Sequence, residues 1–126
     1  MEENSFRKII AWEKAHDLAL DIYKLTLNFP KEETYGIVSQ IRRAVSSIPA
    51  NIAEGYGRKT TRQYINFLSI ANGSLCEANY FLILAHDLGY IDAKDYYRLT
   101  EQCQEIGKIL NSTIKTLKIK EQKIED

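Results

Sequence analysis

The residue types that could carry out chemistry are sparse in this chain. A di-iron site in a helical bundle needs a Glu-x-x-His pair on each of two helices, plus a glutamate from each of the other two. Glu13 and His16 supply one such pair, but the other histidine, His86, has Ile83 at the position where the second glutamate should be. We therefore predict no metal site and no bound cofactor.

Nucleophilic catalysis is equally poorly supported, because it needs a nucleophile, a base and an orienting group together. The glycine-rich stretch at residues 55–58 closes a helical pattern, whereas a phosphate-binding loop follows a strand. Cys76 and Cys103 lack the spacing of a metal or redox motif, so we expect free thiols. These observations predict that the protein is not an enzyme.

Basic side chains are concentrated in the middle of an otherwise neutral chain. The 126 residues carry 17 basic and 17 acidic side chains, which argues against a protein that coats nucleic acid with its whole surface. Residues 37–66 hold five basic groups against Glu54 alone. These five are the candidate nucleic-acid-binding residues: Arg42, Arg43, Arg58, Lys59 and Arg62.

Three roles remain open for this basic segment. Guanidinium groups suit phosphate because they donate paired hydrogen bonds. The arginines could instead be buried in a contact between subunits. They could also be ordinary surface charge, with Arg58 paired to Glu54 one turn earlier. Five basic residues are too few to decide among these roles.

Apolar residues recur at steps of three and four in four stretches, and this spacing predicts four helices. Their expected ranges are about 8–28, 32–57, 60–88 and 92–118, with a charged, frayed tail at 119–126. Thr60 and Asp92 are expected N-caps, and Gly89 an expected C-cap. Short connections make neighbouring helices antiparallel, so we predict one domain, an all-α up-down four-helix bundle.

The second stretch combines an apolar face with a proline. Its stripe is Val38, Ile41, Val45, Ile48, Ile52 and Tyr56. Pro49 removes one backbone hydrogen bond, so we predict a kink there, with Ser46 or Ser47 as candidates to bond the freed carbonyl of Val45. The opposite face carries small residues, which would let another helix or subunit come close.

The third stretch carries more apolar surface than one core needs. One stripe runs from Tyr64 to Leu82, and a second runs beside it from Phe67 to Leu88. Tyr80 and Ile83 lie outside both stripes and would be exposed in a monomer, so we assign them to an oligomer interface. No signal peptide or membrane span is apparent, and we expect a cytoplasmic protein without membrane contact.

Several short motifs together resemble a known family. They are WEKA at 12–15, FP at 29–30, QIRRA at 40–44, SIPANIAEG at 47–55, Arg58, FLSIANGS at 67–74, Glu77 and DLGYI at 87–91. In this order the chain is similar to the bacterial four-helix-bundle proteins encoded in intervening sequences of large-subunit ribosomal RNA genes. The resemblance covers roughly residues 8–115, and the arginine-pair and Ser-Ile-Pro block is its most specific part.

The resemblance implies a bundle that assembles into a homopentamer. It also implies binding to ribosomal RNA or other structured nucleic acid. A relative of that family, the accessory variability protein of diversity-generating retroelements, adds a reverse transcriptase as a partner. That relative is strongly basic, whereas this chain is neutral, which favours the branch outside the retroelements.

Two functional hypotheses follow from the sequence. The first is a non-enzymatic oligomer that binds structured RNA or DNA through Arg42 to Arg62. The alternative is a protein-interaction or scaffold module without a nucleic-acid role. Both require self-association.

Overall fold

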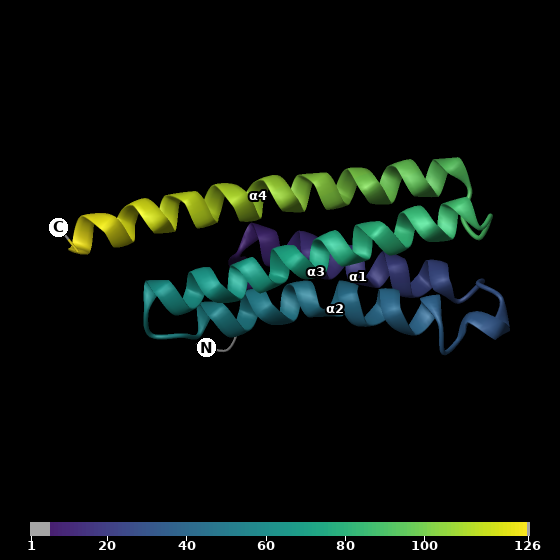
Figure 1. Ribbon diagram of the computed structural model, residues 1–126, viewed down its shortest axis with the longest axis horizontal. Helices are drawn as coiled ribbons and strands as arrows, with labels where there is room; N and C mark the ends of the chain where they lie inside the picture. The colour runs from purple at the N-terminus through teal and green to yellow at the C-terminus, as the bar shows by residue number, and fades with distance from the viewer. Residues whose placement is uncertain (1–5, 126) are drawn as a thin grey trace.

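The computed structural model describes residues 6–125 and consists of four helices, with no strand in that range. The helices are α1 (Ile10–Thr26), α2 (Ile37–Tyr56), α3 (Thr61–Asp87) and α4 (Ala93–Glu125), with a short 3-10 helix, η2 (Lys31–Glu33), before α2. Figure 1 shows the four long helices side by side in one bundle. The predicted all-α four-helix bundle is confirmed.

Contacts between helices fix their relative directions. Arg62 bonds to Glu121 and Asn72 bonds to Asn111, so α3 and α4 run antiparallel. On α1 and α4, Lys14 pairs with Glu105 while Asp21 pairs with Arg98, which is again an antiparallel register. The start of α1, the end of α4 and the α2–α3 connection therefore lie at one end of the bundle, opposite the other two connections (Figure 1).

The expected helix caps are present. The Thr60 side chain accepts a 3.1 Å hydrogen bond from the Gln63 backbone, and Asp92 accepts a 2.8 Å bond from the Asp95 backbone. Each bond satisfies a backbone N–H that the first turn of a helix leaves free. Gly89 follows the end of α3 with φ of +83°, a conformation that favours glycine over residues with a Cβ.

Two predicted boundaries were wrong. The second helix begins at Ile37 and not near residue 32, because η2 and the bonds that follow it close 3-10 turns as far as Gly36. The fourth helix ends at Glu125 and not near residue 118, and within this extension Glu121 contacts Arg62 of α3. Fraying of this segment stays a prediction. Residue 126 of the predicted tail lies outside the described residues.

The core consists largely of the predicted stripes. The largest fully buried side chains come from all four helices: Leu18, Ile22, Ile41, Val45, Ile48, Ile52, Leu68, Leu82, Leu99, Ile106 and Leu110. Tyr56, predicted to end the stripe of the second helix, is instead 46% exposed. The second stripe of α3 is only partly in the core: Ala85 is buried and Phe81 packs against the core, whereas Ile70 and Leu88 are half exposed.

Pro49 is buried inside α2, which is assigned as one helix from Ile37 to Tyr56. The hydroxyl groups of Ser46 and Ser47 do not bond to the Val45 carbonyl. Ser46 donates to the carbonyl of Arg43 at 3.2 Å, and the Ser47 hydroxyl bonds to Ser74 and Asn51. The bend expected at Pro49 stays a prediction.

One described helix, α3, is long and apolar enough to cross a membrane on length and composition alone. This finding does not test the expectation of a protein without membrane contact, which stays a prediction. The face of α3 that carries Leu68, Ala71, Leu75, Ala78 and Leu82 is buried in the bundle, and core helices pass the same test.

Candidate interaction surfaces

Arg42 is an internal clamp between helices. Its Nε donates a 2.9 Å hydrogen bond to Oγ1 of Thr26, and its guanidinium donates a 3.2 Å bond to the carbonyl oxygen of Tyr23. The guanidinium carbon also lies 4.7 Å from the centre of the Tyr23 ring. The last carbonyls of a helix lack partners and carry partial negative charge, which an arginine can neutralise. Arg42 is thus engaged with the end of α1.

Arg58 and Arg62 also have intramolecular partners. Arg58 pairs with Glu54 at 3.1 Å, as one of the three sequence-based alternatives predicts, and lies 4.8 Å from the Phe67 ring centre. Arg62 donates a 2.9 Å hydrogen bond to Glu121 of α4. Together with Lys59 in the connection between α2 and α3, they form what we call the basic corner: Arg58, Lys59 and Arg62.

Arg43 is exposed, and its side chain makes no hydrogen bond or ion pair with the described residues. It lies 13 residues before the end of α2, which is about 20 Å at ~1.5 Å per residue. Arg43 and Lys59 are therefore far apart along the bundle. The five predicted residues do not form one patch: Arg42 is a clamp, Arg43 stands apart, and the basic corner lies at the end of the bundle where α1 begins and α4 ends.

The small-residue face of α2 is partly occupied by α3. Ser74 donates a 2.9 Å hydrogen bond to the Ser47 hydroxyl. A Cβ added at Gly55 would lie 2.6 Å from the Cβ of Phe67, so the two helices touch where glycine leaves room. The close approach predicted for this face is thus made, at these positions, by a helix of the same chain.

Tyr80 and Ile83 are exposed, as the sequence predicted, at 54% and 37%. Ile70 and Cys76 are exposed on the same helix, and we call these four residues the α3 face. Between Gln63 and His86 the chain contains a single charged residue, Glu77. An exposed helix with so little charge is unusual for a surface that faces only water.

No group of three or more His, Cys, Asp or Glu side chains in the described residues could hold a metal ion. His16, the histidine of the Glu-x-x-His pair, stacks on Trp12 with ring centres 4.9 Å apart. Both cysteines are free thiols. Burial raises the pKa of the Cys103 thiol to about 12, so this group is a neutral core side chain at physiological pH.

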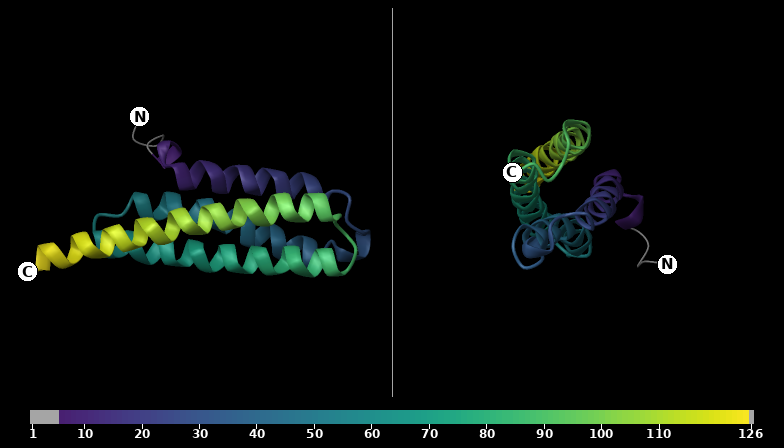
Figure 2. Two further views of the ribbon diagram at one scale, coloured as in Figure 1. Left: turned by 90° about the horizontal axis from the view of Figure 1, so that it is seen from above. Right: turned by 90° about the vertical axis from the view of Figure 1, so that its right-hand side faces the viewer.

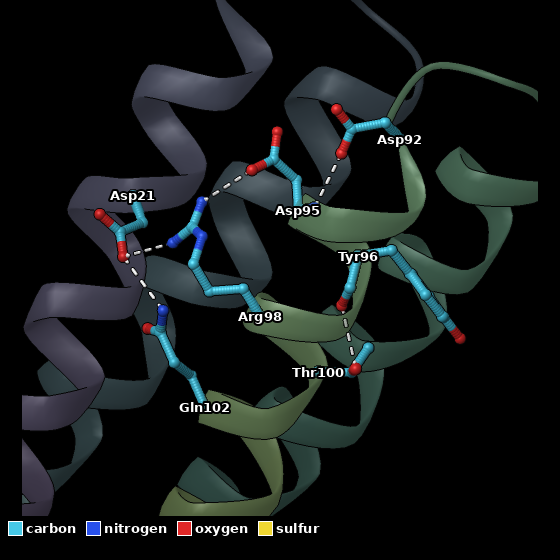
Figure 3. A network of polar contacts seen from close by, with 7 residues as sticks. All are labelled: Asp21, Asp92, Asp95, Tyr96, Arg98, Thr100 and Gln102. Carbon is cyan, nitrogen blue, oxygen red and sulfur yellow. Dashed lines mark hydrogen bonds and ion pairs between the residues drawn. The ribbon is translucent and has the colours of Figure 1, made fainter.

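Helices α1 and α4 meet through polar side chains. Oδ2 of Asp21 accepts 3.2 Å hydrogen bonds from both Arg98 and Gln102, and Arg98 also reaches Asp95 (Figure 3). Lys14 pairs with Glu105 further along, and this contact raises the pKa of the Lys14 ammonium group. A cavity of about 270 Å³ lies between these two contacts. Sequence reasoning missed this polar seam, because its partners are about 80 residues apart.

Comparison with known proteins decides the family. Residues 7–112 match the model of the 23S rRNA-intervening sequence protein family. This chain belongs to that family. A solved structure of similar fold is a protein of unknown function from the S23 ribosomal protein family of Bacteroides thetaiotaomicron. It is 31% identical, with a TM-score of 0.77, and the match covers 84% of this chain and 99% of that one. No curated protein matches the chain.

The family match ends at residue 112, although α4 continues to Glu125. Lysines are frequent towards this end of α4, and they are absent from the basic segment predicted from the sequence. Five lie between Ile106 and Lys123: Lys108, Lys115, Lys118, Lys120 and Lys123. Their sequence signal was hidden, because residues 67–126 as a whole contain more acidic than basic side chains.

Proposed function

We propose that this member of the 23S rRNA-intervening sequence protein family is a non-enzymatic assembly module that self-associates through the α3 face. The observation that carries the proposal is the exposure of Ile70, Tyr80 and Ile83 on the stretch of α3 between Gln63 and His86, which contains one charged residue, Glu77. Removing apolar side chains from water is the main favourable contribution to most protein association. A ring of five copies is the assembly that the family resemblance implies.

Charge substitutions on the α3 face test this function. The variant Ile70→Glu, Tyr80→Glu, Ile83→Glu should be monomeric at micromolar concentration, because burying three carboxylates costs far more than the contact returns. The control Ile10→Glu, Leu27→Glu, Tyr35→Glu makes the same charge change at exposed apolar positions elsewhere. Light scattering should find the wild type and the control equally associated. A monomeric wild type would exclude the proposal.

A second function, binding to the phosphates of structured nucleic acid, is supported by the basic corner. Arg58, Lys59 and Arg62 lie within a few residues of each other at one end of the bundle, and Arg62 links them to the end of α4. Phosphate-driven affinity falls steeply with salt. We expect Arg58→Gln, Lys59→Gln, Arg62→Gln to bind structured ribosomal RNA more weakly than the wild type at low salt. Equal and salt-independent affinities would refute this role.

Arg42 is left out of that variant because its loss would loosen the contact of α2 with α1. Arg43→Gln serves as a control, because Arg43 is exposed yet distant from the basic corner.

A further inference from the structure

Basic side chains are concentrated in the second part of α4. From Ile106 to Lys123 the helix carries five lysines and one carboxylate, Glu121. Glu121 is already bonded to Arg62 of α3. All five lysines are exposed, and none makes an ion pair with another described side chain. The charge of these lysines therefore faces solvent without internal neutralisation.

Helical geometry gathers most of these lysines on one side. At ~100° per residue, Lys108, Lys115, Lys118 and Lys123 fall within an arc of about 140°, opposite the core positions Ile106, Leu110 and Leu117. We call these four residues the lysine face. They span about 22 Å along the axis at ~1.5 Å per residue. Figure 2 shows this part of α4 on the outside of the bundle, reaching past the ends of the other helices.

The other residues on this arc favour a nucleic-acid duplex over a membrane surface or a single strand. Asn111, Ser112 and Gln122 are polar, and Ile119 is the one large apolar side chain among them. A helix that binds a membrane surface inserts a broad apolar face beside its lysines, which this arc lacks. Binding of single strands relies on aromatic side chains that stack on bases, and the arc contains none. A row of lysines alone is complementary to closely spaced phosphates.

We propose that the lysine face of α4 binds the phosphate backbone of a nucleic-acid double helix, without reading its sequence. The inference rests on the second proposed function and changes its centre from the basic corner to α4. The Arg62–Glu121 contact joins the two surfaces, so the basic corner extends the lysine face at the end of the bundle. Lysine ammonium groups act as point charges, which attract phosphates whatever the base sequence.

Two variants with the same charge change test the proposal. The first is Lys115→Gln, Lys118→Gln, Lys123→Gln on the lysine face. The control is Lys24→Gln, Lys31→Gln, Lys94→Gln, which removes three exposed lysines at the opposite end of the bundle. Binding to duplexes of about 20 base pairs, RNA and DNA, is measured by fluorescence anisotropy between about 50 and 200 mM salt. Circular dichroism checks that both variants fold.

We expect the lysine-face variant to lose affinity and to lower the slope of log K against log salt by about three, close to one per phosphate contact removed. The control should bind like the wild type, and duplexes of unrelated sequence should bind equally. If the lysine-face variant binds like the wild type while the basic-corner variant is impaired, this inference fails and the proposed function stands. A wild type that binds no duplex at low salt overturns both.

Two further outcomes would assign the lysine face to another partner and so overturn the proposal. The first is tighter binding to a single strand of equal length than to the duplex. The second is tighter binding to phosphatidylserine-containing vesicles than to either nucleic acid.

Discussion

The guanidinium of Arg42 on α2 and the hydroxyl of Thr26 at the end of α1 form a 2.9 Å hydrogen bond. Thr26 is the one buried polar residue among the described side chains, and its hydroxyl also donates to the carbonyl of Ile22 at 2.8 Å. One side chain of the basic segment thus completes the bonding of a buried group on another helix. Its neighbour Arg43 points to solvent without a partner among the described residues.

This difference predicts that substitution of Arg42 lowers the free energy of unfolding, whereas substitution of the adjacent Arg43 leaves it nearly unchanged. Arg42→Gln should lower the free energy of unfolding by about 1–3 kcal/mol, because a hydrogen bond to a charged donor is lost and the Thr26 hydroxyl loses a partner. Arg43→Gln should change it by less than about 0.5 kcal/mol. Urea unfolding of both variants measures the difference. Equal effects would mean that the clamp contributes nothing to stability.

Replacing either of two glycines by alanine should change the free energy of unfolding, in opposite directions for Gly55 and Gly73. Gly55→Ala would place a Cβ 2.6 Å from Phe67 and 3.0 Å from Tyr64, so we expect a loss of about 1–3 kcal/mol from forced repacking. Gly73 lies inside α3 with nothing within 4 Å of an added Cβ. Gly73→Ala should therefore gain about 0.5–1 kcal/mol through helix propensity. Thermal unfolding at one protein concentration compares them, and a stabilised Gly55→Ala protein would contradict the close contact.

The buried thiol predicts a dependence of stability on alkaline pH. Burial raises the pKa of Cys103 from 9.0 to about 12, so above pH 9 the unfolded chain releases this proton before the folded chain does. The contribution of Cys103 to the free energy of unfolding is fully present below pH 9. It then falls by about 1.4 kcal/mol per pH unit as the pH rises towards 12. Urea unfolding at several pH values should show a shallower fall for Cys103→Ala. Cys76→Ala should change the slope less than Cys103→Ala, because burial is the larger cause of the raised Cys103 pKa and the charge of Cys76 the smaller.

The polar contacts between α1 and α4 should contribute little to the free energy of unfolding, and this contribution should depend on salt. Asp21→Asn should cost less than about 1 kcal/mol, because its ion pair with Arg98 is partly exposed, and the cost should shrink in high salt. At low salt, the backbone amides of α1 should exchange hydrogen faster in Asp21→Asn than in the wild type, because the Asp21 contacts link α1 to α4. Asp17→Asn is the control, because Asp17 lines the same cavity without an ion pair among the described residues. An identical change in both variants would exclude a role for the Asp21 contacts.

The sequence by itself determined the number of helices, their caps and most of the core. These features depend on chemistry within a few residues: the spacing that buries Ile41, Val45 and Ile48 on one side, or the hydroxyl of Thr60 that bonds to the Gln63 backbone. It also identified Tyr80 and Ile83 as exposed, because both lie off the apolar stripes.

Only the tertiary structure decided what the charged residues do. A sequence pattern states that Arg42 and Arg62 are basic, but their partners Thr26 and Glu121 are on other helices. Whether a charge is neutralised or free depends on which side chains the packing brings within a few ångströms of it. The structure likewise shows that the lysines of α4, which lie in a segment with more acidic than basic residues, are exposed and make no ion pair with another described side chain.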